Sequence, residues 1–92
     1  MERSFHFRGP ANRLNLRAQN LALFLQIADG IDDHTWLHHL HLHDYSRWMR
    51  EMLDDEKLAD AVREIETDGT LDPQESRQRV RAAIEALRPL TA

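Results

Sequence analysis

The chain has 92 residues, 41 % of them hydrophobic and 30 % charged, and it contains no cysteine. This length holds one small hydrophobic core, the composition is that of an ordinary folded domain, and the lack of cysteine excludes disulfides and thiolate chemistry. The formal net charge of −4 disfavours general nucleic-acid binding, which requires a basic face.

Charge is distributed unevenly along the chain. Residues 1–17 carry four arginines against one glutamate, whereas residues 29–68 carry twelve acidic residues against four basic ones. The N-terminal residues lack the apolar stretch of a signal peptide, and the longest apolar run, residues 21–25, is far shorter than the ~20 residues that cross a bilayer. We therefore expect a cytoplasmic protein without membrane contacts, in which a basic edge meets an acidic middle.

An N-terminal β-hairpin is predicted over residues 4–16. Phe5 and Phe7 alternate with polar residues, and the same alternation returns at Leu14 and Leu16 after a turn of about four or five residues. Because a two-stranded hairpin is marginal in water by itself, these four apolar side chains are expected to pack on helices that follow.

Apolar residues at helical spacing predict about five helices between residues 20 and 88, followed by a tail over residues 89–92. The first helix is expected to end with Gly30 in a left-handed cap. The N-terminal caps expected for the others are Asp32 or Asp33, Asp44, Asp54 or Asp55, and Asp72. Asp72 is the strongest of these signals because Pro73 and Glu75 complete a capping box. Whether the second and third helices are separate or form one kinked helix stays open, and Asp44 favours a break.

The fold class expected is mainly α, or α+β: a short hairpin and about five helices in a small orthogonal bundle, forming one domain over residues 1–92. Trp36, Tyr45 and Trp48 are expected to supply the bulk of the core, although an aromatic pocket for a small ligand is the alternative. The stripes expected to be buried in the fourth and fifth helices are Leu58, Val62 and Ile65, with Ala61 beside them, and Val80, Ala83, Ile84 and Leu87.

A histidine-rich run is the most unusual feature of the composition, because residues 36–44 hold four of the six histidines. On a helix His34, His38 and His41 share one face and can chelate a divalent metal ion through their ring nitrogens. The spacing is permissive but not specific, and a metalloprotease motif is excluded because Thr35, not glutamate, follows His34. The alternative is a loop or helix end with a buried side, at Leu40 and Leu42, and a solvated side, at His41 and His43. No other cofactor is expected.

The other charged residues give weaker indications of a functional site. The acidic clusters at residues 54–56 and 64–68 fit solvated helix ends better than paired catalytic carboxylates. No Ser-His-Asp arrangement or phosphate-binding glycine loop is present. Arg8, Arg13 and Arg17 are candidates for contact with an anion or an acidic partner, although solvated arginines are the plainer interpretation.

Short runs of residues resemble a C-terminal accessory region of bacterial hydrolases of the haloacid dehalogenase superfamily, which are typically phosphatases. The resemblance covers about residues 4–88. The runs are Phe5-His6-Phe7-Arg8-Gly9-Pro10, Leu14 to Leu21, Asp32-Asp33, Thr35-Trp36-Leu37, His39-Leu40, Asp44-Tyr45-Ser46-Arg47-Trp48 and Asp55 to Ala59.

In those hydrolases an N-terminal domain carries the nucleophilic aspartate of an Asp-x-Asp motif and a bound magnesium ion. This chain has no Asp-x-Asp motif. The resemblance therefore implies a non-catalytic interaction or regulatory module whose protein partner is a phosphatase-type hydrolase, on the same or a different chain. The alternatives are a histidine-rich metal-binding module and a small-ligand sensor near Trp36 and Trp48.

The resemblance also separates the histidines. The accessory region has a histidine at the position of His39 and an aspartate at that of Asp44, whereas His38, His41 and His43 are peculiar to this chain. His39 and Asp44 are expected to bond to each other or to a backbone group and so to fix the junction between the second and third helices.

Overall fold

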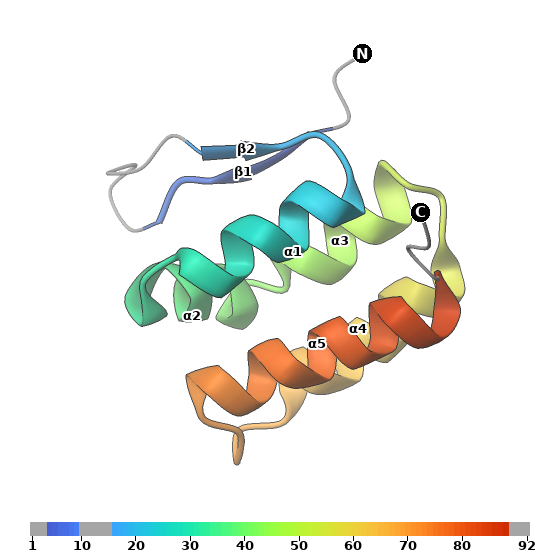
Figure 1. The fold of residues 1–92 in the computed structure, drawn as a ribbon. Helices are drawn as coiled ribbons and strands as arrows, with labels where there is room; N and C mark the ends of the chain where they lie inside the picture. The colour runs from blue at the N-terminus through green and yellow to red at the C-terminus, as the bar shows by residue number, and fades with distance from the viewer. Residues whose placement is uncertain (1–3, 10–15, 89–92) are drawn as a thin grey trace.

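The computed structural model describes residues 4–9 and 16–88 (Figure 1). Their elements are, in chain order, β1 (Phe5–Phe7), β2 (Leu16–Ala18), α1 (Leu21–Gly30), α2 (Asp33–His41), α3 (Asp44–Glu51), α4 (Glu56–Thr67) and α5 (Pro73–Leu87). The predicted fold class, mainly α with an N-terminal hairpin, is confirmed. Within the described ranges no helix combines the length and the apolar character that crossing a bilayer requires.

The two strands form an antiparallel pair in which Phe5 lies opposite Ala18 and Phe7 opposite Leu16. Phe5, Phe7 and Ala18 are buried, but Leu16 is 43 % exposed. The second strand extends to Ala18, beyond its predicted end at Leu16, and the prediction that Leu16 packs on the helices is wrong. Leu14 and the predicted turn lie outside the described residues, apart from Gly9.

The helices lie in layers below the hairpin. Figure 1 shows α1 between the hairpin and the α4–α5 pair, with α2 and α3 behind α1. The closest packing is between α3 and α4 and between α4 and α5, and α1 and α2 also contact α5. This arrangement brings β1 and the residues that follow it next to the junction of α2 and α3.

An aromatic cluster fills the space under the hairpin. Trp36 stacks on Tyr45 with ring centroids 4.4 Å apart, and Phe24 stacks on Trp48 at 5.3 Å. Phe5 contacts Tyr45 and Trp48 from above, with centroid distances of 5.1 Å and 5.5 Å. The prediction that Trp36, Tyr45 and Trp48 belong to the core is confirmed, because all three are buried.

Local capping signals explain most helix starts. Asn20, Asp32 and Asp55 each accept a backbone N–H at the start of α1, α2 and α4, and Asp72 forms the predicted capping box with Glu75. The break between α2 and α3 is confirmed.

Two predicted caps are wrong. Gly30 is the last residue of α1, and the cap that follows is Ile31 in extended backbone. Asp44 is the first residue of α3, and the capping position belongs to His43, which has a φ of 58° and provides no side-chain hydrogen bond. The carboxylate of Asp44 instead bonds to His39, as described below.

The buried stripes of α4 and α5 differ partly from the predicted ones. In α4, Leu58 and Val62 are buried as expected, but Ala59 rather than Ala61 lies in the core and Ile65 is only partly buried. In α5, Val80 and Ile84 are buried, Ala83 is partly buried and Leu87 is 43 % exposed. The remaining buried positions of these stripes belong to Glu66, Ser76 and Arg77.

Candidate functional site

His39 on α2 forms the centre of a hydrogen-bond cluster between the hairpin and α3. Its ring is buried, with 6 % of the residue exposed. Nδ1 lies 2.8 Å from Asp44 Oδ2, and Nε2 lies 3.1 Å from the backbone nitrogens of both Arg8 and Gly9. Because two N–H groups donate to Nε2, that atom is the acceptor and the ring proton sits on Nδ1, from which it is donated to Asp44. The predicted hydrogen bond between His39 and Asp44 is present, as are the backbone bonds.

Gly9 lets the backbone approach His39 in this way. Its φ is +71°, and a Cβ atom there would lie 2.9 Å from Thr35 Oγ1 and 3.3 Å from Thr35 Cγ2. Thr35 is held in place because its hydroxyl and its N–H both donate to Asp32, at 2.7 Å and 2.9 Å. Both the conformation and the lack of space therefore require glycine at this position.

Asp44 connects three parts of the fold through one carboxylate. Oδ2 accepts from His39, whereas Oδ1 lies 3.3 Å from Arg47 Nη1. Arg47 also reaches back, with Nη2 3.3 Å from the carbonyl oxygen of Leu42. The cluster thereby links the end of β1, the end of α2 and the first turn of α3.

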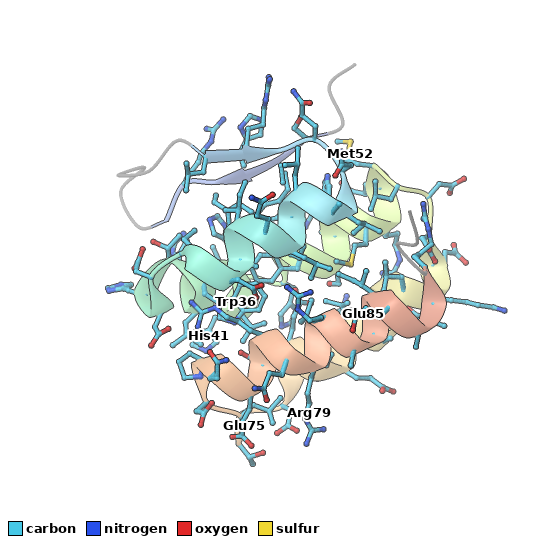
Figure 2. The ribbon with its side chains drawn as sticks, in the orientation of Figure 1. Trp36, His41, Met52, Glu75, Arg79 and Glu85 are labelled. Atoms are coloured by element: carbon cyan, nitrogen blue, oxygen red, sulfur yellow. The ribbon has the colours of Figure 1, made fainter. Side chains whose placement is uncertain are left out.

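A groove lies beside this cluster and has a volume of about 310 Å³. We name it the β1–α3 groove, and its lining residues are Ser4, Phe5, His6, Arg8, His39, Asp44, Arg47, Trp48, Glu51 and Met52. Phe5 and Trp48 are buried apolar residues of the wall, whereas Arg8, Arg47 and Glu51 are exposed. Met52 follows α3 near the hairpin (Figure 2). The groove therefore combines an aromatic wall with a charged rim.

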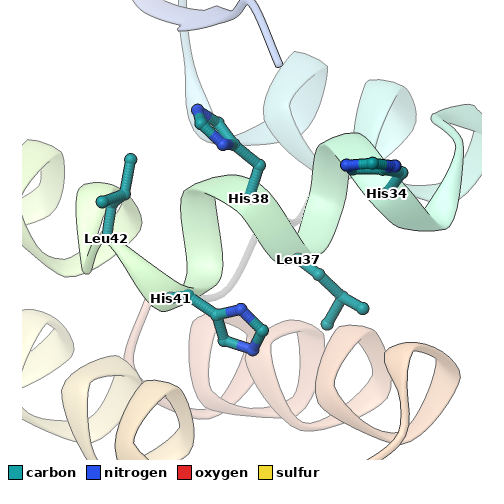
Figure 3. A pocket seen from close by; sticks show the side chains of 5 residues that line it. All are labelled: His34, Leu37, His38, His41 and Leu42. Carbon is teal, nitrogen blue, oxygen red and sulfur yellow. The ribbon is translucent and has the colours of Figure 1, made fainter. Parts of the chain in front are cut away.

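A second pocket, of about 590 Å³, lies on the outer side of α2, and we name it the histidine pocket. Its lining residues are His34, Leu37, His38, His41 and Leu42. Figure 3 shows the rings of His34 and His38 on one side of the pocket and that of His41 on the other. Among the described residues no group of three or more histidine, aspartate or glutamate side chains is placed to hold a metal ion. The structure thus does not bring the three histidines together as a metal-ligand set.

The other candidate residues lie apart. Trp36 and Tyr45 have no exposed surface. The Trp36 indole donates to Ser76 Oγ at 2.8 Å, and the Tyr45 hydroxyl donates to the carbonyl of Trp36 at 2.9 Å. Burial raises the pKa of Tyr45 far above its ordinary value. Of the three large aromatic residues only Trp48 reaches the β1–α3 groove, so an aromatic pocket made of all three is not present.

Two of the three candidate arginines lie within the described residues. Arg8 lines the β1–α3 groove, and Arg17 lies on β2 opposite His6. Arg13 lies outside the described residues. Of this set, Arg8 is the residue that the fold places beside His39 and Asp44.

Arg77 and Glu66 are buried charged residues that the sequence analysis missed. Arg77 donates to the carbonyls of Ala28 and Ile31 at 2.8 Å and 2.7 Å. Glu66 Oε2 accepts the N–H of Ser46 at 3.1 Å. Arg77 precedes Val80 and Ile84 at helical spacing, and Glu66 follows Val62 in the same way, so periodicity was the available signal.

Comparison with known proteins gives no further guidance. Neither a protein-family model, nor a curated protein, nor a solved structure matches this chain at a significant level. The resemblance to the accessory region of hydrolases therefore stays a prediction from the sequence, and the function has to be argued from the geometry.

Proposed function

We propose that this chain is a non-catalytic interaction module that binds and regulates a phosphatase-type hydrolase of the haloacid dehalogenase superfamily in the cytoplasm. The partner is either part of the same polypeptide or a separate protein. The observation that carries the proposal is the arrangement at the β1–α3 groove, where the buried His39 and the partly buried Asp44 support a groove with an aromatic wall and a rim that contains arginines.

The hydrogen bonds of His39 support a structural role for the His39–Asp44 pair. A general base needs a ring nitrogen within hydrogen-bond reach of the proton it removes. Both nitrogens of His39 are used inside the fold, one by Asp44 and one by two backbone N–H groups. The pair therefore positions the end of β1 against α2 and α3, and it fixes the shape of the groove.

The lining of the groove supports protein binding. Aromatic residues, methionine and arginine are enriched where proteins meet, because they combine a large contact area with directed hydrogen bonds. Phe5, Trp48 and Met52 supply the apolar part here, and Arg8 and Arg47 supply exposed donors. A matching partner surface carries an apolar side chain next to a carboxylate.

Calorimetry with a purified hydrolase of this superfamily, encoded next to the chain, tests the proposal. Arg8→Glu reverses a charge at the groove and is expected to weaken binding about tenfold or more. Arg79→Glu is the matched control, because Arg79 is exposed and projects from α5 away from the hairpin (Figure 2). Equal weakening by both variants, or no binding by the wild type, would contradict the proposal.

A phosphatase assay tests the non-catalytic part separately. The purified chain with magnesium and a phosphate monoester is expected to show no turnover above background. Turnover that increases with the concentration of the chain would overturn this part of the proposal, whatever the result of the binding experiment.

A further inference from the structure

A third pocket lies between α3 and α4 and has a volume of about 270 Å³. Its lining residues are His43, Ser46, Arg47, Arg50, Glu51 and Arg63. Three arginines from two helices therefore line one small space, together with a single carboxylate residue, Glu51. We name it the arginine pocket.

The concentration of arginines here contrasts with the surrounding sequence. Residues 29–68 carry twelve acidic residues and only four basic ones, Arg47, Arg50, Lys57 and Arg63. Three of these four line the arginine pocket. The fold thus gathers most of the positive charge of an acid-rich segment at one point.

Two of the three guanidinium groups are held by ion pairs, and all three keep unused N–H donors. Arg50 is paired with Asp60, and Arg47 is paired with Asp44, and neither of these carboxylates lines the pocket. Arg63 is exposed and has no hydrogen bond or ion pair to other residues of the described ranges. Since a guanidinium has five N–H donors, each of the three arginines keeps several for a ligand.

We propose that the arginine pocket binds a phosphate group, either as inorganic phosphate or as a phosphate monoester. The forked donors of arginine match the oxygens of phosphate, which carries a charge of about −1.5 to −2 at neutral pH. The small volume favours a small molecule, and the net charge of −4 opposes a polyanion such as nucleic acid. The pocket shares Arg47 and Glu51 with the β1–α3 groove, but phosphate binding here does not depend on the proposed binding of a hydrolase.

Titration of the ¹⁵N-labelled protein with inorganic phosphate at constant ionic strength tests the site. Saturable shifts are expected for the amides of Ser46, Arg50 and Arg63. Arg63→Gln is expected to weaken binding about tenfold or more, since it removes a charge-assisted hydrogen bond. Arg79→Gln removes the same charge at a distance, on α5, and is expected to change the affinity less than about twofold.

A second variant and a second ligand complete the test of the phosphate site. Arg50→Gln is a second variant expected to weaken binding, and thermal unfolding of each variant verifies that it folds. Glycerol phosphate in place of inorganic phosphate identifies which source of the phosphate group binds more tightly, and saturable binding of either supports the site. Shifts that never saturate, or a loss of affinity as large in Arg79→Gln as in Arg63→Gln, would overturn it.

Discussion

Glu66 of α4 accepts the backbone N–H of Ser46 in the first turn of α3, with an Oε2–N distance of 3.1 Å. The residue before α3, His43, provides no side-chain cap. Glu66 therefore supplies from another helix the acceptor that a capping residue normally supplies locally. Its other oxygen, Oε1, is buried without a hydrogen-bond partner among the described residues. Burial raises the pKa of Glu66 above its ordinary value of 4.5.

The raised pKa predicts that ionisation of Glu66 lowers stability. The folded state keeps the proton to higher pH than the unfolded state. The stabilisation is therefore complete below the unfolded pKa of 4.5, and it is lost as the pH rises through the folded value. Glu66→Gln keeps an oxygen for Ser46 without a charge, so the pH dependence of its free energy of unfolding should lack this loss.

Urea unfolding of both proteins between about pH 4 and about pH 8 measures the difference. Asp32 and Asp55 have lowered pKa values because they accept hydrogen bonds from Thr35 and Leu58, but they titrate alike in both proteins and cancel. A difference between the two proteins that stays constant with pH would contradict the prediction.

Removing His39 should strongly destabilise the fold. His39→Ala leaves the N–H groups of Arg8 and Gly9 and the carboxylate of Asp44 without their partner, which predicts a loss of about 3 kcal/mol in the free energy of unfolding. His41→Ala is the control on the same helix, because His41 is exposed, and it should cost less than about 0.5 kcal/mol. Urea unfolding measures both, and similar losses would show that His39 has no special role.

Alanine should have opposite effects at two glycines. At Gly9 the positive φ and the contact with Thr35 predict a loss of about 2 kcal/mol or more for Gly9→Ala. At Gly30, the last residue of α1, an added Cβ meets nothing within 4 Å, so Gly30→Ala should be neutral or should stabilise by up to about 1 kcal/mol. Thermal unfolding compares them, and a Gly9→Ala protein as stable as the wild type would refute the geometry around His39.

The histidine pocket should bind zinc only weakly. His34 and His38 lie on one side and His41 on the other, and no group of three ligands is formed among the described residues. We expect no saturable zinc binding at micromolar concentrations by calorimetry. Micromolar binding that disappears in both His38→Ala and His41→Ala would instead show that the three side chains converge on the metal.

The sequence predicted those features whose signals are local. Asp72 was identified as a cap because Pro73 and Glu75 stand within the same helical turn. Asp44 was wrongly predicted to cap α3. Its residue type suits a cap, but the path of the chain between α2 and α3 brings His39 to its carboxylate. The second strand extends past its predicted end because alternation alone predicts which face a side chain takes. Its register is set by strand pairing, here of Phe5 with Ala18.

The site was only partly predictable for the same reason. The pairing of His39 with Asp44 was predicted because the resemblance to the hydrolase accessory region singled out these two residues, which lie five apart across a helix break. The hydrogen bonds of His39 with the backbone of Arg8 and Gly9 join residues about thirty positions apart, and no pattern in the sequence predicts them. The β1–α3 groove and the arginine pocket both lie beside α3, and they likewise depend on how β1 and α4 pack against that helix.

Arg77 shows how large the effect of such a distant contact should be. Its guanidinium donates to the carbonyls of Ala28 and Ile31 and to Asp33, and it lies 5.5 Å from the centroid of the Trp36 ring.

An ammonium group cannot reproduce this planar set of donors, so Arg77→Lys should leave carbonyls at the end of α1 unpaired and cost about 3 kcal/mol or more. Arg81→Lys, one turn later on α5, alters only exposed ion pairs with Asp29 and Glu85 and should cost less than about 1 kcal/mol. Urea unfolding of the two variants gives the comparison. Because both changes conserve charge, equal losses would mean that the fork of Arg77 does not hold α1, α2 and α5 together.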